Sequence, residues 1–172
     1  MDNDGNIDVL SDGSSGRDMV WYENTTAAPG NRGFTAATIS TSSGGPIAAY
    51  PKDLDRDGDI DIVAAHRQDS DFEGSIGGIT LYENNGSESF TAHNILSGTA
   101  QYGIHADDLD QDGDMDLIIT NSPSWYENTT STAFDPEWTD HTITTSADEA
   151  YSVYATDVDG DGDLDVLSAS YN

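Results

Sequence analysis

The chain has 172 residues, 35 % of them hydrophobic and 22 % charged, which suffices for one ordinary globular domain with a core. Its charge is one-sided, because 33 acidic residues stand against 5 Lys and Arg, a formal net charge of −28 at pH 7. Such a surface repels nucleic acid and anionic membranes, so the partners that fit it are cations, cationic ligands or a salt-rich medium.

Cysteine is absent, which excludes disulfides and zinc sites built on sulfur. No run of about 18 apolar residues is present, so no membrane insertion is expected. The chain starts at Met1 directly with "DNDGNIDVL", in which no signal peptide is recognisable.

The sequence is a repeat of about 50 residues. The first unit, about residues 1–46, opens with the acidic "DNDGNID", followed by an aliphatic run, "WYEN" from Trp21 and "FTAATIS" from Phe34. The second unit, about 47–98, has "IAAYPKD" first, then "DLDRDGDID", an aliphatic run, "LYEN" from Leu81 and "FTAHNIL" from Phe90. This order within a unit is the signature of a repeat architecture.

The third unit, about 99–146, keeps the order, with "YGIHADD", "DLDQDGDMD", an aliphatic run, "WYEN" from Trp125 and "WTDHTIT" from Trp138. A partial fourth unit, about 147–172, has "YSVYATD", "DVDGDGDLD" and an aliphatic run only. The runs are short, rich in Val, Ile, Tyr, Trp and Thr, and separated by Gly, Asn, Ser or Pro, which is typical of strands and not of helices.

Four strands in about 50 residues form one blade of a β-propeller. We therefore predict an all-β fold of four-stranded antiparallel blades, about three blades plus incomplete ends, over the single region 1–172. Because closed propellers usually have four or more blades, two interpretations are left open. The chain is a fragment of a longer one, or it is a homo-oligomer in which two copies close one ring.

The acidic segments place aspartates on alternate positions. Counting from Asp53 as position 1, aspartates occupy positions 1, 3, 5, 7 and 9, and Gly58 occupies position 6. Calcium takes six to eight oxygen ligands, and a loop that curls around it presents alternate side chains to the ion. Two carboxylates about 5 Å apart repel by roughly 3 kcal/mol at an effective dielectric of 20, and a divalent cation reverses that sign. The spacing predicts Ca²⁺ sites. An acidic surface without an ion is the weaker alternative, because the pattern occurs three times in register.

The EF-hand begins similarly but requires a bidentate Glu at position 12 and flanking helices. Position 12 is Ala64, Ile119 or Ser168 here, which excludes it.

The three complete acidic segments and the repeated "YEN" resemble the FG-GAP/VCBS-type repeats of integrin-alpha-like β-propellers. The resemblance covers essentially the whole chain and implies calcium loops between the first two strands of each blade. In that family the ions are structural, and the repeats serve adhesion and ligand binding or stand beside an enzyme domain. The Phe-Gly and Gly-Ala-Pro strings of the integrin type are absent here, which favours the VCBS side.

Residue by residue, the resemblance implies about three full sites and a partial fourth. The carboxylate ligands would be Asp53, Asp55, Asp57 and Asp61; Asp108, Asp110, Asp112 and Asp116; and Asp157, Asp159, Asp161 and Asp165. Carbonyls would come from Asp59, Asp114 and Asp163. The first segment keeps Asp2, Asp4, Asn6 and Asp8 but has no residue at position 1.

The function expected from these features is a calcium-binding module for adhesion, ligand binding or display, extracellular or on the cell surface, with a protein or carbohydrate ligand. The alternative is a polysaccharide lyase or hydrolase with its site at the channel mouth. No catalytic constellation supports the alternative. Four acidic residues outside the calcium register remain for it: Asp71, Glu73, Asp148 and Glu149.

Overall fold

The structure is a computed structural model. It describes residues 1–2, 4–12, 18–25, 33–41, 46–67, 77–129, 137–147 and 150–170. Across these ranges every regular element is a β-strand, which confirms the all-β prediction. No helix within them has the length and hydrophobicity of a membrane-spanning segment.

Within the described ranges, thirteen strands form four antiparallel sheets of three, four, four and two strands, the grouping that the repeat predicts. The first sheet contains β1 (Val9–Asp12), β2 (Met19–Asn24) and β3 (Phe34–Ser40). The second contains β4 (Pro46–Lys52), β5 (Asp61–His66), β6 (Gly78–Asn84) and β7 (Phe90–Ser97).

The third sheet contains β8 (Ile104–Asp107), β9 (Asp116–Ile119), β10 (Ser124–Asn128) and β11 (Trp138–Thr142). The fourth pairs β12 (Ala150–Thr156) with β13 (Asp165–Ser170). Within each sheet consecutive strands are neighbours, so every sheet is a meander with the topology of a propeller blade.

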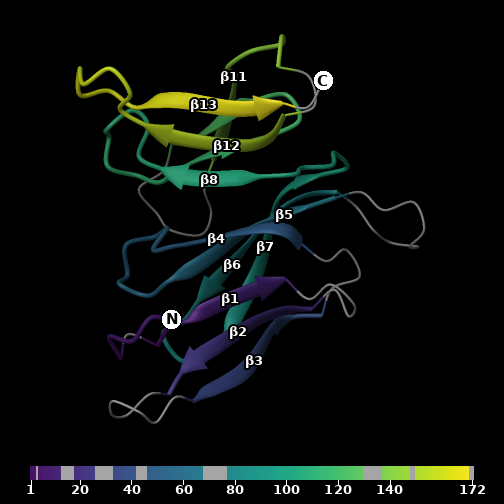
Figure 1. Ribbon diagram of the computed structural model, residues 1–172, viewed down its shortest axis with the longest axis vertical. Coiled ribbons are helices and arrows are strands. Elements are labelled where there is room, and N and C mark those ends of the chain that lie inside the picture. Colours follow the sequence, from purple (N-terminus) through teal and green to yellow (C-terminus); the bar gives the residue numbers. More distant parts are fainter. Residues whose placement is uncertain are drawn as a thin grey trace.

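The sheets are stacked in chain order along the longest axis of the molecule (Figure 1). β4 lies beside β8, and β8 lies beside β12. Hydrophobic clusters fill the spaces between successive sheets. Ile62 and Met19 lie between the first and second sheets, Val63 and Leu117 between the second and third, and Ile118 and Val153 between the third and fourth.

Neighbouring residues of β5, the second strand of its blade, therefore pack into two different hydrophobic clusters. Ile62 faces the first sheet and Val63 the third, and both are fully buried. Because side chains alternate across a strand, a strand buried on both faces is a continuous apolar run. The run "IVAA" in β5 is buried on both faces in this way. The run "LII" in β9 is buried on both faces as well.

Aromatic residues of the "YEN" strands contribute to the hydrophobic core. Trp21 is 1 % exposed and Tyr82 is 4 % exposed, and Tyr126 packs against the core between the second and third sheets. Tyr50, His105 and Tyr154, at one repeat position of the first strand, form a row, with ring centroids 4.8 Å and 4.6 Å apart.

Candidate metal centres

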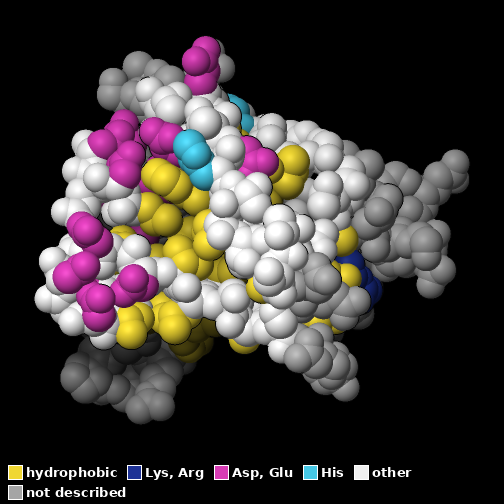
Figure 2. Space-filling view, turned by 90° about the horizontal axis from the view of Figure 1, so that it is seen from above, with side chains coloured by type: hydrophobic (Ala, Val, Ile, Leu, Met, Phe, Trp, Pro, Cys, Tyr) yellow, Lys and Arg dark blue, Asp and Glu magenta, His cyan; other side chains and the backbone are white. Residues whose placement is uncertain are grey.

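The acidic loops connect the first strand of a blade to the second. Loop 53–61 joins β4 to β5, loop 108–116 joins β8 to β9, and loop 157–165 joins β12 to β13. Loop 2–8 precedes β1. All four lie along the same edge of the stack, on the left in Figure 1. In the view from the end of the stack, acidic side chains gather along that edge (Figure 2).

Each complete loop is coiled by its own aspartates. The position 5 N–H donates to the position 3 carboxylate, from Asp57 to Asp55 (3.0 Å) and from Asp112 to Asp110 (3.1 Å). The position 7 N–H donates to the position 5 carboxylate in the same way, and Gly58 donates to Asp53 (3.2 Å). Short polar side chains that accept from the backbone two residues on stabilise such turns. The coil brings the carboxylates of positions 1 and 3 close to each other in every complete loop.

The loop coil also requires left-handed backbone at two positions. Gly58, Gly113 and Gly162, at position 6, have φ of 97°, 99° and 101°. Glycine adopts this conformation without a steric penalty. Position 4 is left-handed as well, with φ of 63° at Arg56 and 61° at Gln111.

Three groups of carboxylates come together, one in each complete loop. In each group, one ligand atom per residue lies within 4.8 Å of the others. The groups are Asp53, Asp55 and Asp57; Asp108, Asp110 and Asp116; and Asp157, Asp159 and Asp165. Position 5 contributes in the first group and position 9 in the other two. At such a separation each pair of charges repels by about 3 kcal/mol at an effective dielectric of 20.

Unsatisfied oxygens in the first two groups indicate that a cation fits there. Asp53 Oδ1 and Asp108 Oδ1, both at position 1, are buried and have no hydrogen-bond partner within the described part of the chain. A buried carboxylate oxygen without a donor is costly unless something positive satisfies it. Hard oxygen donors of this kind suit Ca²⁺ or Mg²⁺, not the softer transition metals.

The position 9 aspartate has a second role that the sequence did not indicate. Asp116 Oδ2 accepts the N–H of Leu109 (3.0 Å), and its Oδ1 accepts the N–H of Asn128 (2.9 Å). Asp61 is held in the same way by Leu54 (3.0 Å) and Asn84 (2.9 Å). One carboxylate thus ties the start of the loop to the end of the third strand. The Asn of "YEN" is the residue that sequence reasoning missed, although its repetition was visible.

Burial of this carboxylate changes its acidity. Asp61 and Asp116 are both 0 % exposed. Burial raises the pKa of each to about 6, although the backbone N–H donors oppose the shift. Burial also raises the pKa of Asp55 and Asp110, and the neighbouring carboxylates add to it. The loops therefore hold their negative charge at a cost, which a bound cation would remove.

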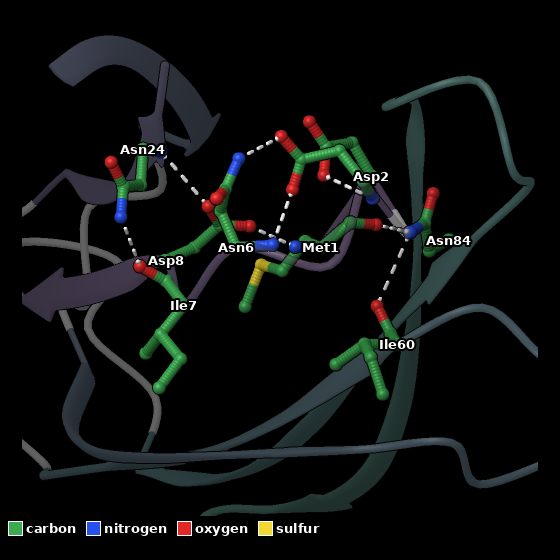
Figure 3. A network of polar contacts seen from close by, with 9 residues as sticks. Met1, Asp2, Asn6, Ile7, Asp8, Asn24, Ile60 and Asn84 are labelled. Carbon is green, nitrogen blue, oxygen red and sulfur yellow. Dashed lines mark hydrogen bonds and ion pairs between the residues drawn. The ribbon is translucent and has the colours of Figure 1, made fainter. Parts of the chain in front are cut away.

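Loop 2–8 is organised by the same contacts but does not gather its carboxylates. The Met1 nitrogen contacts Asp8 Oδ2, and it takes the place that the Leu54 nitrogen has at Asp61 in the second unit. The N–H of Asn24 donates to Asp8 Oδ1 (2.9 Å) (Figure 3). Asn6 bonds to Asp4 through its backbone and its side chain. Among the described residues Asp2, Asp4 and Asp8 form no group of three, and the partial site at this loop stays a prediction.

The loops of successive blades are also joined to one another. Arg56 Nη2 lies 3.3 Å from Asp114 Oδ1, which links position 4 of one loop to position 7 of the next. Gln111 Nε2 repeats the link, 2.9 Å from the Gly162 carbonyl and 3.3 Å from Asp163 Oδ1. Asn84 Nδ2 lies 3.4 Å from the Met1 carbonyl and 3.2 Å from that of Ile60 (Figure 3).

The comparison with protein families identifies this architecture. A model of the FG-GAP-like repeat matches residues 1–64, 53–119 and 108–168, which together cover almost the whole chain. The chain belongs to the FG-GAP-like repeat family. Successive matches overlap over 53–64 and 108–119. Each overlap contains an acidic loop and the strand that follows it, which lie at the end of one match and at the start of the next. No curated protein matches the chain.

Two histidines of the FG-GAP-like repeats pair with glutamates outside the loops. His93 Nε2 lies 2.7 Å from Glu83 Oε2, and His141 Nε2 lies 2.6 Å from Glu127 Oε2. The ring of His141 also stacks on Trp125, with centroids 4.7 Å apart. These contacts give His93 and His141 a packing role on the strand surface. Asp71, Glu73, Asp148 and Glu149, on which the enzyme alternative depended, lie outside the described residues.

Proposed function

We propose that the chain is a calcium-binding β-propeller module in which Ca²⁺ stabilises the loops 53–61, 108–116 and 157–165. The observation that supports this most directly is the buried, unpartnered Oδ1 of Asp53 and of Asp108 within a group of three carboxylates. The FG-GAP-like repeat family supports it independently. The carbonyls of Asp59, Asp114 and Asp163 complete the ligand sets in this proposal.

Calcium fits this arrangement better than magnesium. Mg²⁺ demands near-octahedral geometry and keeps several waters, whereas Ca²⁺ accepts six to eight oxygens in flexible geometry. Several protein oxygens from one coiled loop suit the larger ion. Affinities on the order of 0.1–1 mM are common for extracellular modules, which agrees with the cell exterior that we propose as the location.

We assign the module to ligand binding, adhesion or display, and assign no reaction to it. Paired carboxylates are what a glycoside hydrolase needs, but the carboxylates that come together among the described residues belong to the loops that the cation would occupy.

Thermal unfolding with and without calcium tests the proposal. Ions that bind only the folded state stabilise it by about 1.4 kcal/mol per site at a tenfold excess over Kd. We expect Tm to rise strongly in millimolar CaCl₂, to rise much less in the same concentration of MgCl₂, and to fall with chelator.

A matched pair of variants localises the effect. Asp108→Asn removes a charge from position 1 of a loop, and Asp140→Asn makes the same change at an exposed position of β11. Asp108→Asn should lose about a third of the calcium-dependent shift, and Asp140→Asn none of it. An equal shift in both variants, or no shift in the native chain, would overturn the proposed calcium sites.

A further inference from the structure

Each sheet of the stack has two faces, which we name by their neighbours. The leading face lies toward the preceding sheet, and the trailing face lies toward the following sheet. Within the chain every trailing face packs on the next leading face, and the three hydrophobic clusters lie at these three junctions. Among the described residues two faces have no neighbouring sheet: the leading face of the first sheet and the trailing face of the last.

The open leading face carries three exposed hydrophobic side chains. Ile7 is 85 % exposed, Val9 is 48 % exposed and Phe34 is 56 % exposed. The residues at the Val9 position of the next two units, Ile62 and Leu117, are 0 % and 2 % exposed. Those at the Phe34 position pack against the same junction clusters: Phe90 in the second sheet and Trp138 in the third.

The open trailing face, at the other end of the stack, also carries three exposed hydrophobic side chains. Tyr154, Val158 and Leu167 are 54 %, 61 % and 46 % exposed. The residues at the same positions of the second sheet, Tyr50, Leu54 and Val63, all belong to the cluster against the third sheet. Figure 2 is viewed from this end of the stack and shows hydrophobic side chains at the centre of the face, beside the acidic edge.

These two faces account for most of the large hydrophobic side chains that the described residues expose, six of nine. Contiguous apolar surface of this kind is a mark of an interaction site. The pairing of residues identifies what fits it. Tyr154 lies directly opposite Leu167, as Tyr50 lies opposite Val63 and His105 lies opposite Ile118. The trailing face is thus built to receive the leading face of another blade.

We propose that the trailing face of the last sheet packs on the leading face of the first sheet of a second copy of this chain, head to tail. The contact continues the junctions already present within the chain, where side chains at the same repeat positions pack in or against the hydrophobic clusters. It does not depend on calcium being the ion in the loops.

The acidic edge is compatible with this contact. At the junctions between the second and third sheets and between the third and fourth, a side chain at position 4 reaches position 7 of the next loop, as Arg56 reaches Asp114 and Gln111 reaches Asp163. At the proposed junction position 4 is Gly160, which has no side chain, and position 7 of the second copy is Asn6. Because Asn6 is uncharged where the other loops have aspartate, the junction needs no cationic side chain.

Light scattering coupled to size exclusion tests the contact, with the native chain run in calcium and in chelator. We expect twice the mass of one chain, with association favoured by calcium because the ions reduce repulsion between acidic edges. Leu167→Asp and Val9→Asp each place a charge on one open face, and both should be monomeric. Ile47→Asp is the control, because Ile47 is 36 % exposed on β4, away from both ends.

A mixing experiment separates head-to-tail packing from other dimers. Val9→Asp keeps an intact trailing face and Leu167→Asp an intact leading face, so an equimolar mixture can form one unaltered junction. We expect heterodimers in the mixture although each variant alone is a monomer. Circular dichroism and melting curves of the variants establish that each is folded.

Three results would overturn the proposal. A native chain that is monomeric at hundreds of micromolar would leave the faces to a different partner. A Val9→Asp variant that still dimerises would show that the copies meet through like faces. A mixture that stays monomeric would exclude the junction, because both of its surfaces are present there. A ladder of dimers and larger species would support the junction in an open arrangement.

Discussion

At the scale of single residues, the position 9 aspartates are the most constrained groups of the loops. Asp116 accepts backbone N–H groups on both oxygens and is fully buried, whereas Asp108 keeps one oxygen without a donor. Two aspartates of one loop therefore do different things. Asp116 holds the blade together in addition to lying in the group of three carboxylates, and Asp108 has an oxygen left free for an ion.

Asparagine variants distinguish these roles. In Asp116→Asn the amide nitrogen would face a backbone N–H, leaving a buried donor unsatisfied, and we expect a loss of about 1–3 kcal/mol with or without calcium. In Asp108→Asn the metal-free chain should be unchanged or slightly more stable, because one like charge is removed. Urea unfolding in chelator and in calcium measures both. Equal losses for the two variants in chelator would contradict this division.

The raised pKa values predict an unusual pH dependence for the metal-free chain. Asp61 and Asp116 have pKa values of about 6 in the folded state, above the value of about 3.9 for an unfolded chain. The folded state therefore binds more protons between about pH 4 and 6, and stability rises as the pH falls from 7. We expect about 1 kcal/mol for each carboxyl by pH 5.

Urea unfolding of metal-free protein at pH 5 and pH 7 measures this gain. With calcium the trend should reverse, because protons and the ion compete for the same loops. The double variant Asp61→Asn with Asp116→Asn controls for relief of the overall negative charge. It should lose most of the metal-free gain; an undiminished gain would show that the overall charge causes it.

At the scale of elements, the strands and loops follow from local patterns that the sequence displays. "IVAA" after "DLDRDGD" predicts a strand buried on both faces, and Ile62 and Val63 are each 0 % exposed. The contacts between loops were not predictable in this way. Arg56 and Asp114 are far apart in sequence, and their contact depends on how two blades are stacked. Patterns within a unit contain no information about that placement.

The link from Gln111 to the next loop permits a separate prediction. Gln111→Ala removes the contacts to Gly162 and Asp163 but keeps a left-handed residue at φ 61°. Gln111→Gly removes the same contacts and also the steric cost of that conformation, about 1 kcal/mol. We expect Gln111→Ala to lose about 0.5–1 kcal/mol and Gln111→Gly to remain near the native stability.

Calcium titration by calorimetry adds a second observable for these variants. If the link positions loop 157–165, both variants should bind calcium a few-fold more weakly at one site, since both lack the amide side chain. Unchanged calcium affinity in both variants would show that the contact of Gln111 does not position loop 157–165. A weakened site in Gln111→Ala alone would attribute the effect to the backbone.

At the scale of the whole molecule, each hydrophobic cluster is formed by side chains of two successive sheets. Stability in such an array is close to a sum over units and the junctions between them. A side chain at a given repeat position should therefore contribute to stability only where a neighbouring sheet packs against it. Ile118 and Leu167 occupy the same position of successive units, yet Ile118 is 0 % exposed and Leu167 is 46 % exposed.

Truncating both residues to alanine tests this directly. Ile118→Ala leaves a cavity between the third and fourth sheets and should cost about 2–5 kcal/mol at every protein concentration. Leu167→Ala should cost less than about 0.5 kcal/mol at high dilution, where the last trailing face meets only water. Urea unfolding over a wide range of protein concentration measures both. If copies pack head to tail, the cost of Leu167→Ala grows with concentration because the lost contacts lie between chains. A cost as large as that of Ile118→Ala at high dilution would mean that Leu167 is already covered within a single chain.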